Sequence, residues 1–177
     1  MNLVLLHGAP ASGKYTVGQA LAALTGYPLY HNHLVVDEVL QRHAFGTPEF
    51  IAARDRAWRD YFTQAAQQQT PGVTFTFNPE NTVPQSFIDW LFGDLPRQGV
   101  GIISVELLAT EAVIEARLAE ASRRQFRKLT DLMLYRQQRD SGSFRTPLIP
   151  RTDLRIDTEK EKPTAAARRI TEYFHLC

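Results

Sequence analysis

A glycine-bounded loop near the start of the chain limits the possible folds more than any other sequence feature. Residues 2–7 form an apolar run of strand length, and Gly8 ends it. Gly13 closes the loop, and apolar side chains then recur at helical spacing over residues 14–24. A buried strand that turns tightly into a helix is the repeating unit of α/β domains. We therefore expect a sheet covered by helices.

The loop itself carries a chemical signature. Residues 8–14 read Gly-Ala-Pro-Ala-Ser-Gly-Lys and match the first seven positions of the phosphate-binding pattern G-x-x-x-x-G-K-[ST]. Its glycines let backbone N–H groups turn inward around phosphate oxygens, and the following helix N-terminus adds about half a positive charge. Lys14 is expected to reach the β- and γ-phosphates of a nucleotide. The alternative is a plain glycine-rich turn with a solvent-exposed lysine.

The rest of the chain repeats this alternation of strands and helices. Strands are expected at residues 27–31, 73–77, 101–108 and 154–156, and helices at residues 34–43, 48–69, 82–97, 130–139 and 163–173, with one more capped by Thr110. This order predicts a three-layer α/β fold with a five-stranded parallel sheet and helices on both faces. We expect one domain over residues 1–177, in which residues 31–70 form a helical substrate-binding flap.

The composition excludes several classes of protein. The chain has 177 residues, 44% of them hydrophobic, with 20 basic and 19 acidic side chains. A strongly basic nucleic-acid binder is disfavoured by this balance. The single cysteine, Cys177, allows no internal disulfide, and no apolar run approaches the length of a membrane span. We expect a cytoplasmic monomer or homodimer that binds small molecules and neither nucleic acid nor membrane.

The loop departs from the common pattern at one position, and this departure points to a family. Tyr15 stands where many such loops have a Ser or Thr that ligates Mg²⁺, and Thr16 follows it. The run Gly-x-Pro-x-Ser-Gly-Lys-x-Thr resembles the loop of adenylate kinases and related nucleoside monophosphate kinases. Over its whole length the chain is similar to P-loop small-molecule kinases, the group that includes shikimate kinases, gluconate kinases and chloramphenicol phosphotransferase. With the run Tyr-His-Asn-His at residues 30–33, it is most similar to uncharacterised bacterial kinase-like proteins.

The resemblance implies the P-loop NTPase fold, ATP as co-substrate and Mg²⁺ as cofactor. It implies that Mg²⁺ is held through phosphates and water, with Thr16 as the one candidate side chain. It places Arg117 near the adenine, which the turn at residues 157–163 would pass beneath. The expected nucleotide-binding residues are Gly8, Ala9, Pro10, Ala11, Ser12, Gly13, Lys14, Tyr15, Thr16 and Arg117.

A basic segment follows the fourth expected strand. Residues 117–139 hold seven basic side chains and two acidic ones. The resemblance implies a lid at residues 120–130, which closes over the nucleotide and brings arginines to the transferred phosphoryl group. Arg123 and Arg127 are the expected catalytic arginines, and Arg124 is a further candidate. The alternative is a solvated helix face, since the chain has 16 arginines and only 4 lysines.

Polar residues gather at the end of the second expected strand, where the resemblance places the phosphoryl acceptor. His31, His33, Asp37 and Glu38 are expected to bind substrate, with Asp37 orienting or deprotonating the acceptor hydroxyl. In strand geometry His31 and His33 would point the same way. Two alternatives stay open: polar packing of the histidines, or a metal site built from His31, His33 and Asp37.

Two other strand ends bear on the site. The third expected strand ends in Asn78, where P-loop enzymes often have an Asp that orients Mg²⁺. Asn78 is expected to contact substrate, and a loop cap is the alternative. Glu106 lies inside the fourth strand, so we expect it to pair with an arginine or a lysine.

These observations predict an ATP-dependent phosphotransferase that moves the γ-phosphoryl group of Mg-ATP to a small hydroxylated or phosphorylated molecule. The expected catalytic residues are Lys14, Asp37, Arg123 and Arg127. The alternative is a nucleotide-binding sensor or switch without transfer activity, which the departures at Tyr15 and Asn78 favour. The near-neutral charge disfavours a polynucleotide kinase, and a signalling GTPase would need an Asn-Lys-x-Asp motif, which is absent.

Overall fold

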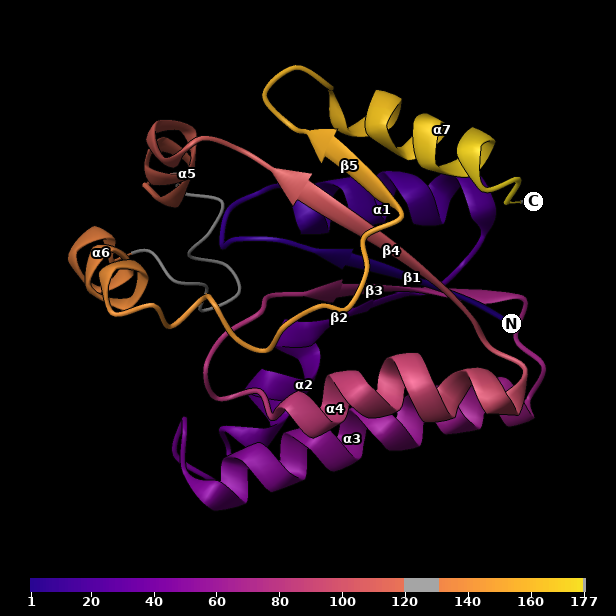
Figure 1. Ribbon diagram of the computed structural model, residues 1–177, viewed down its shortest axis with the longest axis horizontal. Coiled ribbons are helices and arrows are strands. Elements are labelled where there is room, and N and C mark those ends of the chain that lie inside the picture. Colours follow the sequence, from indigo (N-terminus) through magenta and orange to yellow (C-terminus); the bar gives the residue numbers. More distant parts are fainter. Residues whose placement is uncertain (120–130, 177) are drawn as a thin grey trace.

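The computed structural model describes residues 1–119 and 131–176, and it is built around one parallel sheet (Figure 1). The five strands are β1 (Asn2–His7), β2 (Leu29–His31), β3 (Gly72–Phe77), β4 (Gly101–Leu108) and β5 (Leu154–Asp157). Their order across the sheet is β2-β3-β1-β4-β5, and every pair is parallel. The prediction of a five-stranded parallel sheet is therefore confirmed.

β1 lies at the centre of the sheet, and its four inner residues are apolar. Leu3, Val4, Leu5 and Leu6 are fully buried, as strands covered on both faces require. β1 pairs with β3 on one side and with β4 on the other. Parallel pairing brings the carboxyl ends of all strands to one edge, which is where α/β proteins hold their ligands.

Helices cover both faces of this sheet. Figure 1 shows α1 (Lys14–Thr25) and α7 (Pro163–Tyr173) on one face, and α2 (Asn32–Val39), α3 (Pro48–Gln67) and α4 (Gln85–Asp89) on the other. The first face is packed with aliphatic residues, among them Val17, Leu21 and Ile170. The second face is largely aromatic; its core includes Phe50, Trp58, Phe62, Phe75, Phe77 and Phe87.

α3 is a fixed part of this second core. Its start is set by Thr47, whose hydroxyl accepts a hydrogen bond from the Phe50 amide at 3.2 Å, and by Pro48 in the first turn. The helix then buries Phe50, Trp58 and Phe62 against the sheet. The function of residues 31–70 as a flap stays a prediction.

The segment at residues 82–97 differs from the single helix predicted for it. α4 begins after Pro84, so Thr82 is not its cap. A π-helix (Trp90–Asp94) and a 3₁₀-helix (Leu95–Gln98) follow. Pro96 lacks the N–H that a continuous α-helix would use, and it lies in the first turn of the 3₁₀-helix. α2 also begins at Asn32, two residues earlier than expected.

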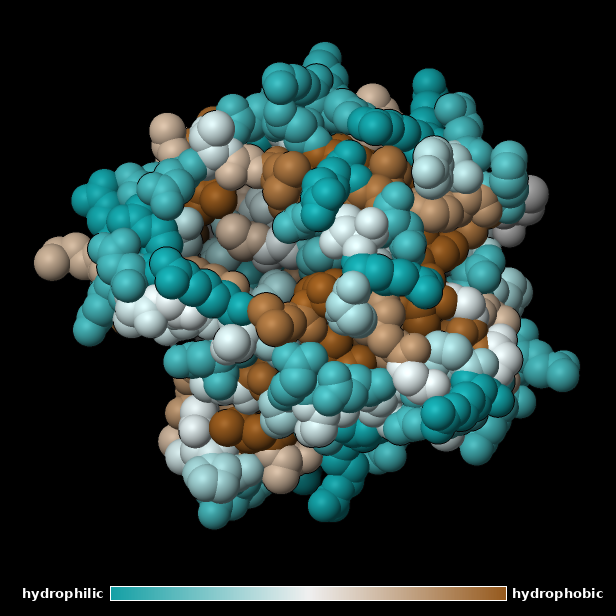
Figure 2. Space-filling model, in the orientation of Figure 1, coloured by the Kyte–Doolittle hydropathy of each residue, from teal (hydrophilic) through white to brown (hydrophobic). Residues whose placement is uncertain are grey.

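Two further helices, α5 (Glu111–Leu118) and α6 (Leu132–Asp140), lie beyond the carboxyl ends of the strands (Figure 1). Ile114, Leu118 and Tyr135 form a third, small core between them, against which Ala9 and Ala11 of the loop pack. The surface is hollowed on this side of the molecule (Figure 2). No helix within residues 1–119 and 131–176 has both the length and the apolar character to cross a membrane.

Candidate functional site

A cavity of about 770 Å³ opens at the carboxyl edge of the sheet. It is lined by the loop after β1, the start of α1, α2, the segment after β3, and the turn after β5. Sequence analysis placed most of its site residues here: the cavity is lined by Pro10, Ala11, Gly13, Lys14, Tyr15, Thr16, His31, His33, Asp37, Asn78 and Arg117. Residues of the expected nucleotide and acceptor sites therefore share one cavity.

The loop after β1 has the backbone that its glycines predict. Gly8 has φ +142° and Gly13 has φ +93°, both in the region that favours glycine. A Cβ added to Gly8 would clash with the backbone oxygen of Leu107 on β4, so the loop packs directly against the sheet. Gly13 caps α1 without a side-chain hydrogen bond. The first amides of a helix are not bonded within it, and in many proteins such amides bind anions.

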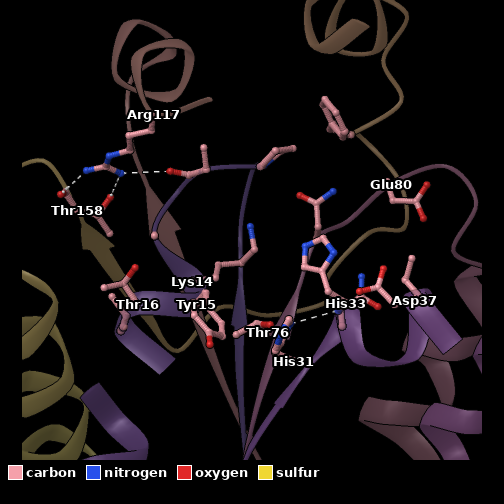
Figure 3. Close-up of a pocket in the computed structure, with 18 of the residues that line it drawn as sticks. Lys14, Tyr15, Thr16, His31, His33, Asp37, Thr76, Glu80, Arg117 and Thr158 are labelled. Carbon is pink, nitrogen blue, oxygen red and sulfur yellow. Dashed lines mark hydrogen bonds between the residues drawn. The ribbon is translucent and has the colours of Figure 1, made fainter. Parts of the chain in front are cut away.

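Lys14 holds its ammonium group over this loop. Its Nζ donates to the backbone oxygens of Gly8 at 2.8 Å and Ala9 at 2.6 Å, and lies 3.4 Å from the Ser12 hydroxyl. Figure 3 shows Lys14 near the middle of the cavity, between Arg117 and Thr158 on one side and Asp37 and Glu80 on the other. A lysine held this way can exchange loop carbonyls for phosphate oxygens.

Arg117 ties the loop to the turn after β5. Its guanidinium donates to the Thr158 hydroxyl at 2.9 Å, to the Thr158 backbone oxygen at 2.9 Å and to the Ala11 backbone oxygen at 3.3 Å. The Thr158 hydroxyl lies 3.0 Å from the backbone oxygen of Ser12. Arg117 therefore braces the loop, and its expected place near the adenine stays a prediction.

His31 and His33 are close together, but not through strand geometry as predicted. The strand ends at His31, which caps α2: its Nδ1 accepts a hydrogen bond from the His33 amide at 3.3 Å. His33 lies in the first turn of that helix, with its ring 5.5 Å from the His31 ring. Tyr15 meets His31 edge-on at 4.9 Å. The predicted strand geometry is wrong because α2 already begins at Asn32, yet both histidines line the cavity.

The two acidic candidates on α2 differ in position. Asp37 lines the cavity, whereas Glu38 is exposed and does not line it. Adjacent positions on a helix point about 100° apart, so only one of them can face the cavity. Asp37 is therefore the acidic residue of α2 that can reach a molecule bound there.

Sequence analysis missed the buried pair of Arg54 and Glu80. Arg54 is 1% exposed, and it donates to Glu80 Oε1 at 2.9 Å and to the Thr82 backbone oxygen at 2.7 Å. Burial lowers the pKa of Arg54 from its ordinary value, and the neighbouring Glu80 carboxylate opposes that shift. The spacing of Phe50, Arg54 and Trp58, four residues apart on α3, was the signal that could have found it, because it puts Arg54 on the buried face.

Glu106 and His7 are two further polar residues on the strands next to the loop. Glu106 pairs with Arg155 of the neighbouring strand at 2.8 Å, as expected of a carboxylate inside a strand. His7 is buried, and its Nε2 lies 3.0 Å from the Ser104 hydroxyl. Burial lowers the pKa of His7 to about 4, with Lys14 and Arg155 adding to that effect and Glu106 opposing it. Sequence analysis took His7 only as the end of a strand.

Three further candidates are the expected lid arginines. Arg123, Arg124 and Arg127 belong to the predicted lid at residues 120–130, which lies outside the described residues. Their roles stay predictions.

Metal-binding side chains are sparse around the cavity. Among residues 1–119 and 131–176, no three His, Cys, Asp or Glu side chains are arranged to hold a metal ion, so the alternative of a site made by His31, His33 and Asp37 gains no support. Thr16 lines the cavity at the start of α1, and Asn78 lines it at the end of β3. A hydroxyl at Thr16 and an amide at Asn78 suit a Mg²⁺ ion that arrives with the nucleotide and is held through its phosphates.

The sheet order, the glycine-bounded loop and the lysine that follows it define the fold of the P-loop small-molecule kinases. A sugar kinase from a Janibacter species matches with a TM-score of 0.68 and 15% identity, covering 100% of this chain and 96% of its own. A shikimate kinase from Acinetobacter baumannii, solved with shikimate, matches at 0.64 and 18%, covering 98% and 92%. A gluconokinase from Sinorhizobium meliloti matches at 0.61 and 18%, covering 98% and 95%. No protein-family model matches the sequence, and no curated protein matches it significantly.

Proposed function

We propose that this protein is an ATP-dependent phosphotransferase, which moves the γ-phosphoryl group of Mg-ATP to a small hydroxylated or phosphorylated molecule. The observation that carries the proposal is that Lys14, in the loop after β1, lies between Arg117 and Asp37 in one cavity (Figure 3). A phosphotransferase needs this arrangement, because donor and acceptor must meet across the transferred group. Likeness of fold to three kinases supports the same conclusion.

In this proposal the amides of residues 8–16 and the Lys14 ammonium hold the β- and γ-phosphates. An acceptor hydroxyl lies beside Asp37, and its oxygen attacks the γ-phosphorus. As that bond forms, the bond from the γ-phosphorus to the bridging oxygen breaks, and its electron pair leaves with ADP. The hydroxyl proton passes to the Asp37 carboxylate and then to solvent.

Positioning and charge stabilisation would supply most of the acceleration. Mg²⁺, when bound, neutralises charge on the phosphates, and Thr16 is the described side chain that would hold it. Arg123 and Arg127 are proposed to stabilise charge on the transferred group. Residues 31–70, through α2 and the chain that follows it, are proposed to shape the acceptor side.

A second function is favoured by one specific observation. Tyr15 and Asn78 line the cavity where P-loop enzymes often have a hydroxyl and a carboxylate for Mg²⁺. A nucleotide-binding switch without transfer activity would need neither group. It predicts ATP binding without any ADP release that depends on an acceptor.

The test is ADP release from Mg-ATP against pools of nucleosides, nucleoside monophosphates, sugar acids, polyols and amino-alcohol antibiotics. We expect one pool to stimulate release, and we expect Lys14→Ala to reduce it at least about a hundredfold, the scale of one lost charge stabiliser. Arg168→Ala, which removes an exposed cation from α7, is the matched control and should keep wild-type turnover. Unchanged turnover in folded Lys14→Ala would contradict the proposal.

A further inference from the structure

One wall of the cavity is polar and is formed by α2, α3 and the segment after β3. Its polar residues, which we call the acceptor wall, are Asn32, His33, Asp37, Arg54, Asn78, Glu80 and Asn81. Asp37 and Glu80 lie across Lys14 from Arg117 (Figure 3). The charges and hydrogen-bonding groups of this wall decide which molecules can bind against it.

The cation of the acceptor wall is already neutralised. Arg54 is bonded to Glu80 at 2.9 Å and to the Thr82 backbone oxygen at 2.7 Å. Its guanidinium also packs over the rings of Phe50, at 5.1 Å, and Trp58, at 4.8 Å. Its Nε is buried and has no hydrogen-bond partner among the described residues. An anionic ligand that took over the guanidinium atom bonded to Glu80 would break this ion pair and leave Glu80 unpaired beside it, which is unfavourable.

The other polar groups of the wall include hydrogen-bond acceptors that a bound molecule could use. The amide oxygens of Asn32 and Asn78 are buried, and neither has a hydrogen-bond partner within the described residues. Asp37 adds a carboxylate, which accepts hydrogen bonds only. Buried acceptors without partners are costly, so a bound molecule that supplies N–H or O–H donors would satisfy them.

The charge balance points the same way. Because Arg54 and Glu80 neutralise each other, the Asp37 carboxylate is the remaining acidic group among the described residues of the acceptor wall. Val36, Leu40 and Phe45 line the cavity beside it and bring no charge. A carboxylate or phosphate placed here would meet a like charge and acceptor atoms, whereas hydroxyl or ammonium groups would meet complementary ones.

We propose that the phosphoryl acceptor of this protein is a neutral or cationic molecule rich in hydroxyl or amino groups, a polyol or an amino alcohol, and not a carboxylic acid or a phosphate ester. This inference rests on the proposed function and narrows its acceptor class.

The first test is binding, which does not depend on transfer. Calorimetry of the full chain with Mg²⁺ and β,γ-imido-ATP compares glucitol with gluconate, and glucosamine with glucuronate. We expect a neutral or amino compound to bind at least about tenfold more tightly than its acid partner. Equal or tighter binding of the acids, or no binding of either uncharged or amino compound, overturns the inference. Failure of the proposed function would appear separately, as no ADP release with any acceptor.

The second test removes the carboxylate charge that neutralises Arg54. Glu80→Gln leaves Arg54 without its carboxylate, and we expect the ratio of acid to neutral affinity to rise at least about tenfold. Glu49→Gln, which alters an exposed carboxylate in the first turn of α3, is the control and should keep the wild-type ratio. A wild-type ratio in folded Glu80→Gln would overturn the inference. Should that variant not fold, the comparison of matched compounds on the wild-type protein decides.

Discussion

Among single residues, Gly8 tolerates a side chain least, because both its backbone angle and its neighbours are against one. It has φ +142°, and an added Cβ would clash with the backbone oxygen of Leu107. We expect Gly8→Ala to lower the free energy of unfolding by about 1–3 kcal/mol. Gly93→Ala is the control, since a Cβ there meets nothing within 4 Å and the residue is exposed. Denaturant unfolding of both variants is the measurement, and equal stabilities would refute the expectation.

His7 gives the protein a pH-dependent stability. The folded protein keeps His7 neutral because burial lowers its pKa from 6.5 to about 4, whereas the unfolded chain takes up a proton near 6.5. Between these values the unfolded state binds more protons. Stability is therefore full above about pH 6.5 and falls as the pH drops toward 4, by up to about 3 kcal/mol from this residue.

The check on His7 is the slope of stability with pH. Denaturant unfolding of the wild type and of His7→Gln, which can still bond to Ser104, is compared from about pH 7 down to about pH 4.5. We expect a shallower loss of stability in His7→Gln. Parallel curves for the two proteins would show that His7 does not titrate as described.

Sequence analysis predicted which loop residues line the cavity better than it predicted those on the acceptor side. Lys14 and Asp37 line the expected cavity because a motif and a helix start place them there. Glu38 does not line the cavity. The side of α2 that Glu38 faces could not be predicted without knowing the residue at which the helix begins. Arg54 and Glu80 are separated by 26 residues, and only the fold brings such a pair together.

Among the elements, the turn after β5 and the loop after β1 act as one unit because Arg117 and Thr158 bond to both. We expect Arg117→Met to weaken ATP binding about tenfold and to lower stability by about 2 kcal/mol, since charged hydrogen bonds of this kind are worth about 1.5–3 kcal/mol. Arg97→Met is the control, because Arg97 is 79% exposed. Calorimetric titration with ATP and denaturant unfolding measure the two effects. Equal ATP affinity in both variants would mean that Arg117 does not brace the site.

Most elements were predictable, and the exceptions have local causes. Strands 2–7, 73–77 and 101–108 were read from apolar runs, and β1, β3 and β4 span them. A single helix was expected at residues 82–97, but the structure has three short helical segments there. Pro84 precedes the first segment and Pro96 lies in the last, and helix propensity alone does not reveal how these prolines change the hydrogen bonding. Helix periodicity predicts existence better than it predicts ends.

In the whole molecule, the aromatic core beneath α3 and α4 carries much of the stability. Trp58 is fully buried there, yet its indole N–H has no partner within the described residues. We expect Trp58→Ala to cost about 3–5 kcal/mol, as large-to-small changes in cores do. Trp58→Phe should change stability by less than about 1 kcal/mol, because the lost contact area is offset by removal of an unpaired donor. Denaturant unfolding measures both, and a Phe variant as unstable as the Ala variant would contradict this account.

The overall architecture could be predicted because strands and helices alternate along the sequence, which leaves a covered parallel sheet as the packing solution. The order of the strands in the sheet could not be predicted, because it depends on which helices pack on which face of the sheet. The two cores make this plain: aliphatic residues of α1 and α7 meet on one face, while the aromatic residues of α3 meet β3 on the other.

The central place of β1 has a consequence for the newly made chain. Its two partners begin at Gly72 and Gly101, so neither is available when β1 leaves the ribosome. Until Leu108 has emerged, the most apolar strand of the protein has an open edge, which makes it a target for chaperones and for aggregation. A nucleotide cannot help during this interval, because the loop it would bind rests on β4. A nucleotide that binds as proposed could therefore stabilise this protein only late in its folding, once β4 has been made.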